Sequence, residues 1–235
     1  MTVDPGRIAR NLSDVRSRMA AACRRAGRPA DSATLIAVTK TVDLDEVRAL
    51  SVLGVTHFGE NRVQELARKS ASLTDLSCRW HMIGHLQRNK VKALLPHSTI
   101  VHSLESDKLA DVLSRRAAAA DLEIDVLIEV NVAGEQAKYG VAPDAAAALA
   151  DRVVALPALN LRGLMTMAPF LGAGGPESPE ELRPLFARLR ELAQTLSEDL
   201  PDGTMSELSM GMTQDFEVAI EEGATMVRVG SALFA

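Results

Sequence analysis

The stretch TLIAVTK, residues 34–40, is a short apolar run that ends in a lysine. Its length and its β-branched residues are typical of a buried strand. Runs of this kind recur along the chain, and a stretch with helical periodicity separates each from the next. The predicted strands are Thr34–Thr39, Val55–Gly59, Trp80–Ile83, Thr99–His102, Ile124–Val130, Leu161–Met167, Glu207–Met210 and Thr225–Val229. The predicted helices between them cover residues 43–53, 61–71, 88–95, 105–120, 143–155, 179–198 and 213–222.

Strands that alternate with helices predict an α/β fold with a parallel sheet and right-handed crossovers. Their number favours closure into a (β/α)8 barrel, and a chain of 235 residues suits one such domain, spanning residues 1–235. An open doubly wound sheet is the alternative. It usually has fewer strands and often carries a glycine-rich turn after the first, whereas this chain has Thr39-Lys40-Thr41 at that point.

An extra helix is predicted before the first strand. Asp4 is a good N-cap, and Pro5 is tolerated at the first helical position. The apolar residues that follow share one helical face and are Ile8, Leu12, Val15, Met19 and Cys23. The run Ala26–Pro29 ends the helix.

Composition narrows the class of protein. Apolar residues make up 47% of the chain and aromatic residues only 3%, which predicts an aliphatic core. The net charge of -5, without a long basic stretch, argues against nucleic-acid binding. The two cysteines form no CxxC pair or disulfide framework, and no apolar stretch is long enough to cross a bilayer. We therefore expect a cytoplasmic protein.

Lys40 closes the first predicted strand. In a barrel the functional groups lie at the carboxyl ends of the strands, so Lys40 is expected at the mouth. Partial desolvation there disfavours the charged amine, and a neutral amine is a nucleophile toward aldehydes. Taken alone, however, this pattern is explained better by a solvent-exposed lysine at the end of a strand than by a reactive amine.

A second candidate feature is the run SMGMT, residues 209–213, between the seventh strand and the next helix. Gly211 would let backbone approach a ligand closely. Ser209 and Thr213 offer hydroxyls, and the start of the helix offers free N–H groups to an anion. A capped helix after a glycine turn, with Asp215 in its first turn, explains the same residues equally well.

The eighth strand carries a third feature, Arg228 followed by Gly230. Alternation does not decide whether Arg228 points inward, but an inward guanidinium would need an anion. Barrels often bind phosphate between the loops after strands seven and eight, and Lys40 follows the next strand round the barrel. Pyridoxal 5'-phosphate (PLP), with a phosphate at one end and an aldehyde at the other, fits this arrangement.

Other candidates are weaker. Asn61 would either hydrogen-bond the ring oxygen of a ligand or cap the next helix. His81 and His85 form an HxxxH pair, but a zinc site needs that pair on a helix and this segment is predicted as strand and turn, so no metal is expected. The remaining histidines show no ligand spacing. The Gly- and Pro-rich segment Leu171–Pro179 is interpreted as a mobile surface loop rather than a flap over the site.

Together these motifs resemble the pyridoxal phosphate homeostasis proteins, the YggS/PROSC family, over almost the whole chain. The matching segments are Ala37–Lys40, Phe58–Glu65, Trp80–Lys90, Val101–Ser106, Leu161–Met167, Leu208–Asp215 and Met226–Gly230. The resemblance implies a fold like the N-terminal domain of alanine racemase, with PLP held as a Schiff base on Lys40. It implies phosphate contacts at Ser209, Gly211, Thr213, Arg228 and Gly230, and places Asn61 near the cofactor ring. Lys138 is retained from the family pattern, with Ala137 before it in place of the usual serine.

The resemblance also implies a role in storing or delivering PLP, with effects on amino-acid and keto-acid balance. No firm catalytic activity is attached to the family, so we expect a carrier without catalytic residues. The expected partners are PLP, small amines and amino acids, and apo-enzymes that take up PLP. Neither nucleic acid nor membrane is expected as a partner, and the protein is expected to be a monomer.

Two enzymatic alternatives remain. The first is an amino-acid racemase or another fold-type III PLP enzyme. Racemases of this fold take a second base, a tyrosine, from an additional domain of the partner subunit, and this chain has only Tyr139, which argues against racemisation. The second is an aldolase-type enzyme for phosphorylated sugars. Such enzymes surround their lysine with acids, and only Glu60 and Glu129 would approach Lys40 from neighbouring strands.

Overall fold

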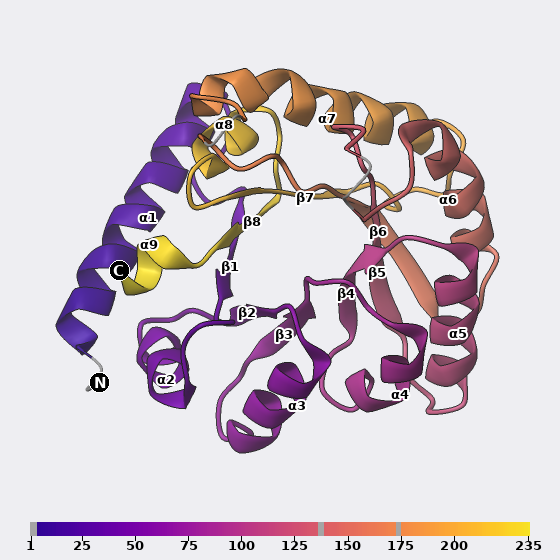
Figure 1. Cartoon of the computed structure of the whole chain (residues 1–235), viewed down its shortest axis with the longest axis horizontal. Coiled ribbons are helices and arrows are strands. Elements are labelled where there is room, and N and C mark those ends of the chain that lie inside the picture. Colours follow the sequence, from indigo (N-terminus) through magenta and orange to yellow (C-terminus); the bar gives the residue numbers. More distant parts are fainter. Residues whose placement is uncertain (1–3, 136–138, 173–174) are drawn as a thin grey trace.

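The structure is a computed structural model that describes residues 4–135, 139–172 and 175–235. In these residues eight parallel strands close into a barrel in chain order, because β1 pairs with both β2 and β8. The helices lie outside the ring of strands (Figure 1). The strands are β1 Thr34–Val38, β2 His57–Glu60, β3 Arg79–Met82, β4 Ile100–Leu104, β5 Ile124–Glu129, β6 Leu159–Met165, β7 Glu207–Met212 and β8 Met226–Val229. The predicted (β/α)8 barrel is therefore confirmed.

The α-helices are α1 Pro5–Arg25, α2 Leu44–Val52, α3 Val63–Ser72, α4 Val91–Leu94, α5 Asp107–Ala118, α6 Ala146–Val154, α7 Arg183–Ser197, α8 Phe216–Glu221 and α9 Ser231–Phe234. Short 3-10 turns at Arg88–Lys90, Pro143–Ala145 and Pro179–Leu182 precede α4, α6 and α7. The helix predicted from residue 213 begins only at Phe216. Residues before it form a turn that the Asp215 carboxylate closes by accepting the Met212 backbone N–H. No helix in the described part of the chain is both long and apolar enough to cross a bilayer.

Helix α1 forms as its sequence predicts. The Asp4 carboxylate accepts the backbone N–H groups of Gly6 and Arg7, and the helix ends at the cap residue Ala26. Its apolar stripe is buried, and the helix lies beside α8 and α9 (Figure 1). The Asn11 amide donates to the backbone oxygens of Leu233 and Ala235, so α1 also fixes the last turn of the chain.

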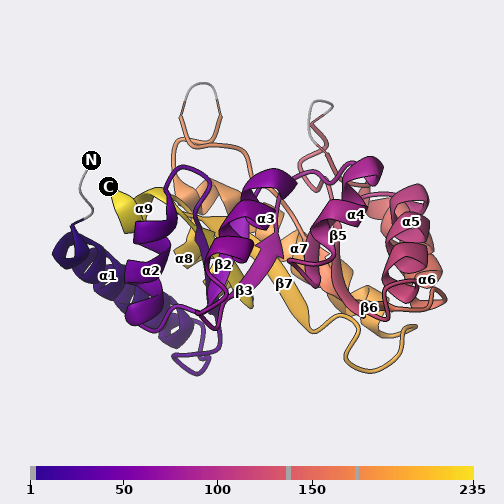
Figure 2. The same cartoon turned by 90° about the horizontal axis from the view of Figure 1, so that it is seen from below.

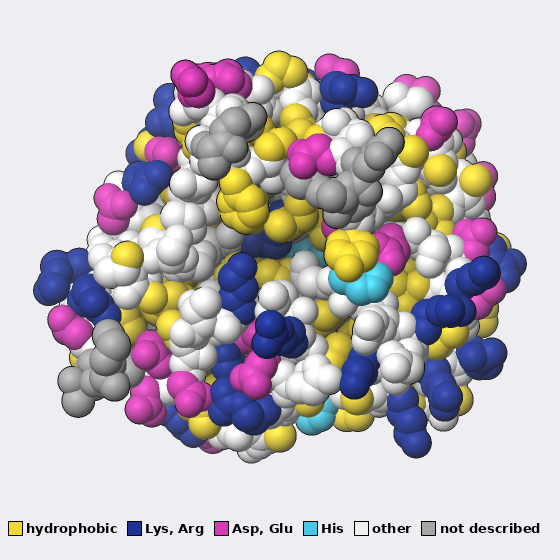
Figure 3. All heavy atoms as spheres, viewed as in Figure 1, with side chains coloured by type: hydrophobic (Ala, Val, Ile, Leu, Met, Phe, Trp, Pro, Cys, Tyr) yellow, Lys and Arg dark blue, Asp and Glu magenta, His cyan; other side chains and the backbone are white. Residues whose placement is uncertain are grey.

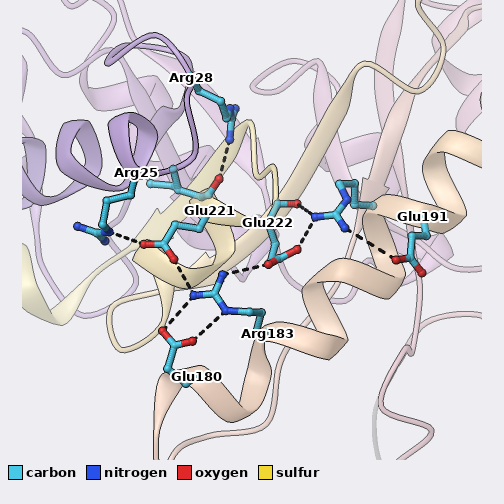
Figure 4. Close-up of polar contacts among 9 residues, drawn as sticks. Arg25, Arg28, Glu180, Arg183, Glu191, Glu221 and Glu222 are labelled. Atoms are coloured by element: carbon cyan, nitrogen blue, oxygen red, sulfur yellow. Dashed lines mark hydrogen bonds and ion pairs between the residues drawn. The ribbon is translucent and has the colours of Figure 1, made fainter.

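An ion-pair network holds α8 between α1 and α7 (Figure 4). Arg183 of α7 lies 2.6 Å from Glu221 and 3.0 Å from Glu222, measured between nitrogen and carboxylate oxygen. Arg25 of α1 lies 2.6 Å from Glu221, and Arg190 of α7 also pairs with Glu222. Since Arg183 and both glutamates each have more than one partner, the network orients α8 better than isolated surface pairs would.

The predicted aliphatic core is only partly correct. Between the sheet and the helices the buried side chains are mainly aliphatic. Inside the barrel, however, His81, His102, Ser209 and Arg228 are almost completely buried. Barrel interiors are normally filled by branched aliphatic side chains, so this polar interior is a special feature of the chain.

Candidate binding site

A pocket of about 590 Å³ opens at the carboxyl ends of the strands. Figure 3 shows this face hollowed near its middle, with basic and histidine side chains in and around the hollow. The loops after β5 and β6 extend from one end of the barrel (Figure 2), and they contribute Tyr139 and Phe170 to the pocket. Both aromatic side chains are exposed, at 58% and 73%. The pocket therefore has an apolar rim above a polar floor.

Seven residues were predicted for the site from sequence, and all of them lie in the described ranges. Five line this pocket, namely Lys40, Asn61, Thr213, Arg228 and Gly230. Ser209 and Gly211 do not line it. The structure thus brings together the predicted lysine and most of the predicted anion contacts, as convergence of the strand ends requires.

Lys40 lies two residues past the end of β1, with its side chain exposed in the pocket. Hydrogen bonds from the backbone and from the Lys69 side chain fix the turn that carries Lys40. Thr39 donates its backbone N–H to the Gly59 carbonyl at 3.1 Å, and Val42 donates to the Thr39 carbonyl at 3.1 Å. The ammonium of Lys69 donates to the carbonyls of Thr39 and Val42 at 2.6 and 2.8 Å. The Lys40 backbone is therefore held on both sides.

The same ammonium pairs with Glu60, which sequence analysis had considered as an acid near Lys40. Glu60 instead faces the helix layer, where its Oε1 accepts from Lys69 and from the Thr39 hydroxyl, each at 2.6 Å. Its other carboxylate oxygen, Oε2, is buried without a hydrogen-bond partner among the described residues. The pair was not predicted from sequence. Glu60 on β2 and Lys69 on α3 are both charged, and a pattern of apolar residues does not mark charged residues as buried.

Of the two acids that line the pocket, Asp215 and Glu129, the second stands at the end of β5. Its side chain is almost buried, and burial raises its pKa to about 7. The nearby charge of Glu105 acts in the same direction, and the charge of Arg228 opposes both. Glu129 therefore exchanges a proton near neutral pH at the wall of the pocket.

Arg228 points inward and forms part of the pocket floor. Its Nη1 donates to the backbone oxygen and the Oγ of Ser209 at 2.8 and 2.6 Å, and its Nη2 donates to the Thr166 carbonyl at 2.8 Å. Burial lowers its pKa to about 10, against the opposing charges of Asp215 and Glu129. No carboxylate of the described residues lies within ion-pair distance of it. A buried cation without a contacting counter-ion favours an anionic ligand in the pocket.

The loops after β7 and β8 meet at the pocket. The Gly230 N–H donates to the Thr213 hydroxyl at 3.3 Å. Gly211 has φ +91°, and a Cβ built on it would lie 2.6 Å from the Cβ of Ala219 in α8. Packing of α8 against β7 therefore explains this glycine without a ligand. Burial raises the pKa of Asp215, which closes the same turn.

Three histidines that sequence analysis left without a role form a line through the barrel. His57 Nδ1 lies 2.9 Å from His81 Nε2, and His81 Nδ1 lies 2.9 Å from His102 Nε2. His102 Nδ1 lies 2.8 Å from Ser209 Oγ. The one feature of the sequence that could have indicated this line is the presence of a histidine in each of three consecutive strands, β2, β3 and β4. His85 is not part of this line, since its ring stacks on Tyr139 at a centroid distance of 4.1 Å.

Metal binding has no support in the described ranges, which contain no group of three or more His, Cys, Asp or Glu side chains able to hold an ion. Lys138, retained from the family pattern, and Ala137 lie outside the described residues, as do residues 173 and 174 of the predicted loop Leu171–Pro179.

Comparison with known proteins identifies the family. The chain matches the alanine racemase N-terminal domain family over residues 3–235. It is 46% identical over 223 residues to the pyridoxal phosphate homeostasis protein of Aquifex aeolicus, with 95% of each chain covered. The chain belongs to the pyridoxal phosphate homeostasis protein family.

Solved structures support the same assignment. PipY of Synechococcus elongatus, in a structure with PLP bound, has a TM-score of 0.83 and 36% identity to this chain. The match covers 97% of this chain and all of PipY. An alanine racemase of Clostridium difficile has a TM-score of 0.74 at 12% identity, and this chain covers 55% of it, so that likeness shows the fold alone.

Proposed function

We propose that this protein binds PLP as a Schiff base on Lys40 and acts in intracellular PLP homeostasis by storing and delivering the cofactor. The observation that carries the proposal is the position of Lys40 and Arg228 in one pocket, the first exposed and the second buried without a contacting counter-ion. An amine nucleophile and an anion site in one cavity suit a phosphorylated aldehyde. PipY, the relative solved with PLP, supports the choice of ligand.

The residues present fit this cofactor. A volume of about 590 Å³ is within the range of small-molecule sites. At the corner between β7 and β8, the Thr213 hydroxyl and the backbone at Gly230 would hold the phosphate. Asn61 would lie beside the ring. When bound, PLP supplies an electrophilic aldehyde carbon and an electron-withdrawing ring.

Arg228 would act from the floor of the pocket. Its two terminal nitrogens already donate to Ser209 and Thr166, so its charge reaches the ligand more readily than its hydrogen bonds do. We propose that it favours binding of the anionic cofactor electrostatically. The contacts of Ser209 and Gly211 with phosphate remain predictions, since neither residue lines the pocket.

Storage and delivery suit a pocket that small molecules can reach. Lys40 is exposed, and the rim residues Tyr139 and Phe170 are largely in contact with solvent. We propose that free amines and amino acids exchange with Lys40 and that apo-enzymes receive the released cofactor. We further propose a single-domain monomer of the cytoplasm.

A spectroscopic titration tests PLP binding. Wild-type protein mixed with PLP is expected to develop the visible absorbance of a Schiff base, and Lys40→Ala is expected to lose it. Lys92→Ala, which changes an exposed lysine of α4, is the matched control and should behave as wild type. For delivery, the loaded protein should activate a PLP-requiring apo-enzyme faster than free PLP at equal concentration. Equal rates would leave storage alone.

One observation keeps the racemase alternative testable. Tyr139, the single tyrosine of the chain, lines the same pocket as Lys40. Incubation with L-alanine and PLP should give no D-alanine above the rate of free PLP. Formation of D-alanine that disappears in both Lys40→Ala and Tyr139→Phe would establish racemisation and overturn the carrier assignment.

A further inference from the structure

The three histidines and Ser209 form one hydrogen-bonded line that ends on Arg228. We call His57, His81 and His102 the interior histidine column. Each successive pair of ring nitrogens is 2.9 Å apart, and the last ring reaches Ser209 Oγ at 2.8 Å. Ser209 Oγ in turn lies 2.6 Å from Arg228 Nη1. The column thus links the amino-terminal end of β2 to the floor of the pocket.

Arg228 gives this line a direction. A guanidinium only donates, so Ser209 Oγ must accept from it. If His102 also donated to Ser209, the buried hydroxyl proton would have no acceptor among the described residues, which is costly. Ser209 therefore donates to Nδ1 of His102. His102 then donates from Nε2 to His81, and His81 donates from Nε2 to His57. All three rings are neutral with the proton on Nε2.

The surroundings favour these neutral rings. Burial lowers the pKa of His81 to about 3, and the neighbouring charge of Arg79 and the ring of His57 act in the same direction. Burial also lowers the pKa of His102 well below its usual value, with His81 and Arg228 as further causes. His57, at the open end of the column, is only half-buried, and burial and Arg79 lower its pKa as well.

We propose that His102 and His81 are positioning residues for the cofactor pocket, which fix the Ser209 hydroxyl so that its oxygen faces Arg228 and holds the guanidinium at the pocket floor. Neither histidine lines the pocket, so both act through Ser209. This inference rests on the proposed function for its binding readout only. The direction of the column is a property of the unliganded protein and is tested separately.

Nitrogen-15 NMR of the histidine rings tests the direction. In unliganded protein at neutral pH, His81 and His102 should each show a protonated Nε2 and an unprotonated Nδ1. Assignment comes from the signals lost in His81→Leu and His102→Leu. A proton on Nδ1, or a doubly protonated ring, at either position would overturn the proposal whatever the protein binds.

PLP affinity tests the positioning role with two variants of nearly equal size. The new side chain in His102→Asn keeps an acceptor where Nδ1 stood and can still accept from Ser209, whereas the new side chain in His102→Leu cannot. His102→Leu leaves the hydroxyl proton unpaired and is expected to weaken PLP binding roughly 10-fold, while His102→Asn stays within about 3-fold of wild type. Wild-type affinity in His102→Leu, or an equal loss in both variants, would overturn the role.

Two controls separate the possible failures. Circular dichroism and a urea titration show whether each variant folds; if His102→Leu does not, Ser209→Ala replaces it. That small substitution removes the fixed hydroxyl and should also weaken binding roughly 10-fold. Unchanged affinity in Ser209→Ala would refute the positioning role. If wild-type protein binds no PLP while the NMR pattern is as expected, the proposed function fails and the direction of the column stands.

Discussion

Lys69 Nζ lies 2.6 Å from Glu60 Oε1, and the two side chains are 1% and 0% exposed. The same ammonium also donates to the backbone carbonyls at both ends of the turn that carries Lys40. A buried pair of this kind costs desolvation energy, so it contributes little net stability and is better understood as a device that fixes geometry. Here the geometry that it fixes is the starting point of the Lys40 side chain.

Removal of one partner should be strongly destabilising. Lys69→Met leaves the Glu60 carboxylate buried and uncompensated, and we expect a loss of about 3–5 kcal/mol in the free energy of unfolding, measured by urea titration. The double variant Lys69→Met/Glu60→Leu should recover most of that loss, because it leaves no buried charge. Arg48→Met, which breaks an exposed pair with Asp75, serves as the control and should change little. A double variant no more stable than Lys69→Met would refute this account of the pair.

Glu129 should make the stability of the protein depend on pH. Its pKa of about 7 lies above the ordinary value of 4.5, so the folded protein binds the proton more tightly than the unfolded chain. The wild type should therefore lose stability as the pH rises from about 4.5 to 7, with no further loss from this group above that range. Glu129→Gln removes the effect, so its advantage over wild type should be near zero at pH 4 and roughly 3 kcal/mol at pH 8.

Urea titrations at both pH values measure this difference. Glu198→Gln, which changes an exposed carboxylate just past α7, is the matched control. A difference between Glu129→Gln and wild type that is the same at pH 4 and pH 8 would mean that Glu129 ionises as an ordinary carboxylate.

Gly211 should be intolerant of even a methyl group. Its φ of +91° is unfavourable for other residues, and an added Cβ would clash with Ala219 of α8. We expect Gly211→Ala to lower the free energy of unfolding by about 2–4 kcal/mol, the sum of backbone strain and overpacking. Gly27→Ala shares the positive φ but meets no atom within 4 Å, so it should show only the backbone part. Equal losses in the two variants would show that α8 yields to the added methyl.

The exposed position of Lys40 predicts ready exchange of the bound cofactor. Excess of a small primary amine, such as ethanolamine, should change the visible spectrum of the PLP-loaded protein within the time of mixing and compete with Lys40 for the aldehyde. The change should reverse when the amine is removed by dialysis. A spectrum that stays constant in large excess of amine would mean that the rim around Tyr139 and Phe170 closes the pocket.

The fold could be predicted because two periodicities alternate regularly along the chain, and a closed parallel barrel is the arrangement that this alternation favours. Five of the seven predicted site residues line the pocket, since strand ends converge on one face, whereas Ser209 and Gly211 do not line it. The start of α8 could not be predicted. The Met212 N–H donates to the Asp215 carboxylate, and the turn that this hydrogen bond closes takes the place of a first helical turn.

The Lys69–Glu60 pair and the interior histidine column escaped prediction for a shared reason. Single strands of four or five residues do not show which of their faces looks into the barrel. Glu60 was one of two acids that the strand order allowed to approach Lys40, and it faces the helices instead, while His57, on the same strand, faces the interior. Only the closed barrel shows that histidines of three different strands stand in line.

The most direct test of the proposed function is the site of covalent attachment. Protein loaded with PLP is reduced with borohydride, digested, and analysed by mass spectrometry. The reduced pyridoxyl phosphate group is expected on Lys40 in nearly all molecules, and the peptide carrying Lys69 should be unmodified. Attachment spread over exposed lysines, or a Lys40→Ala variant labelled as fully as wild type, would contradict the account.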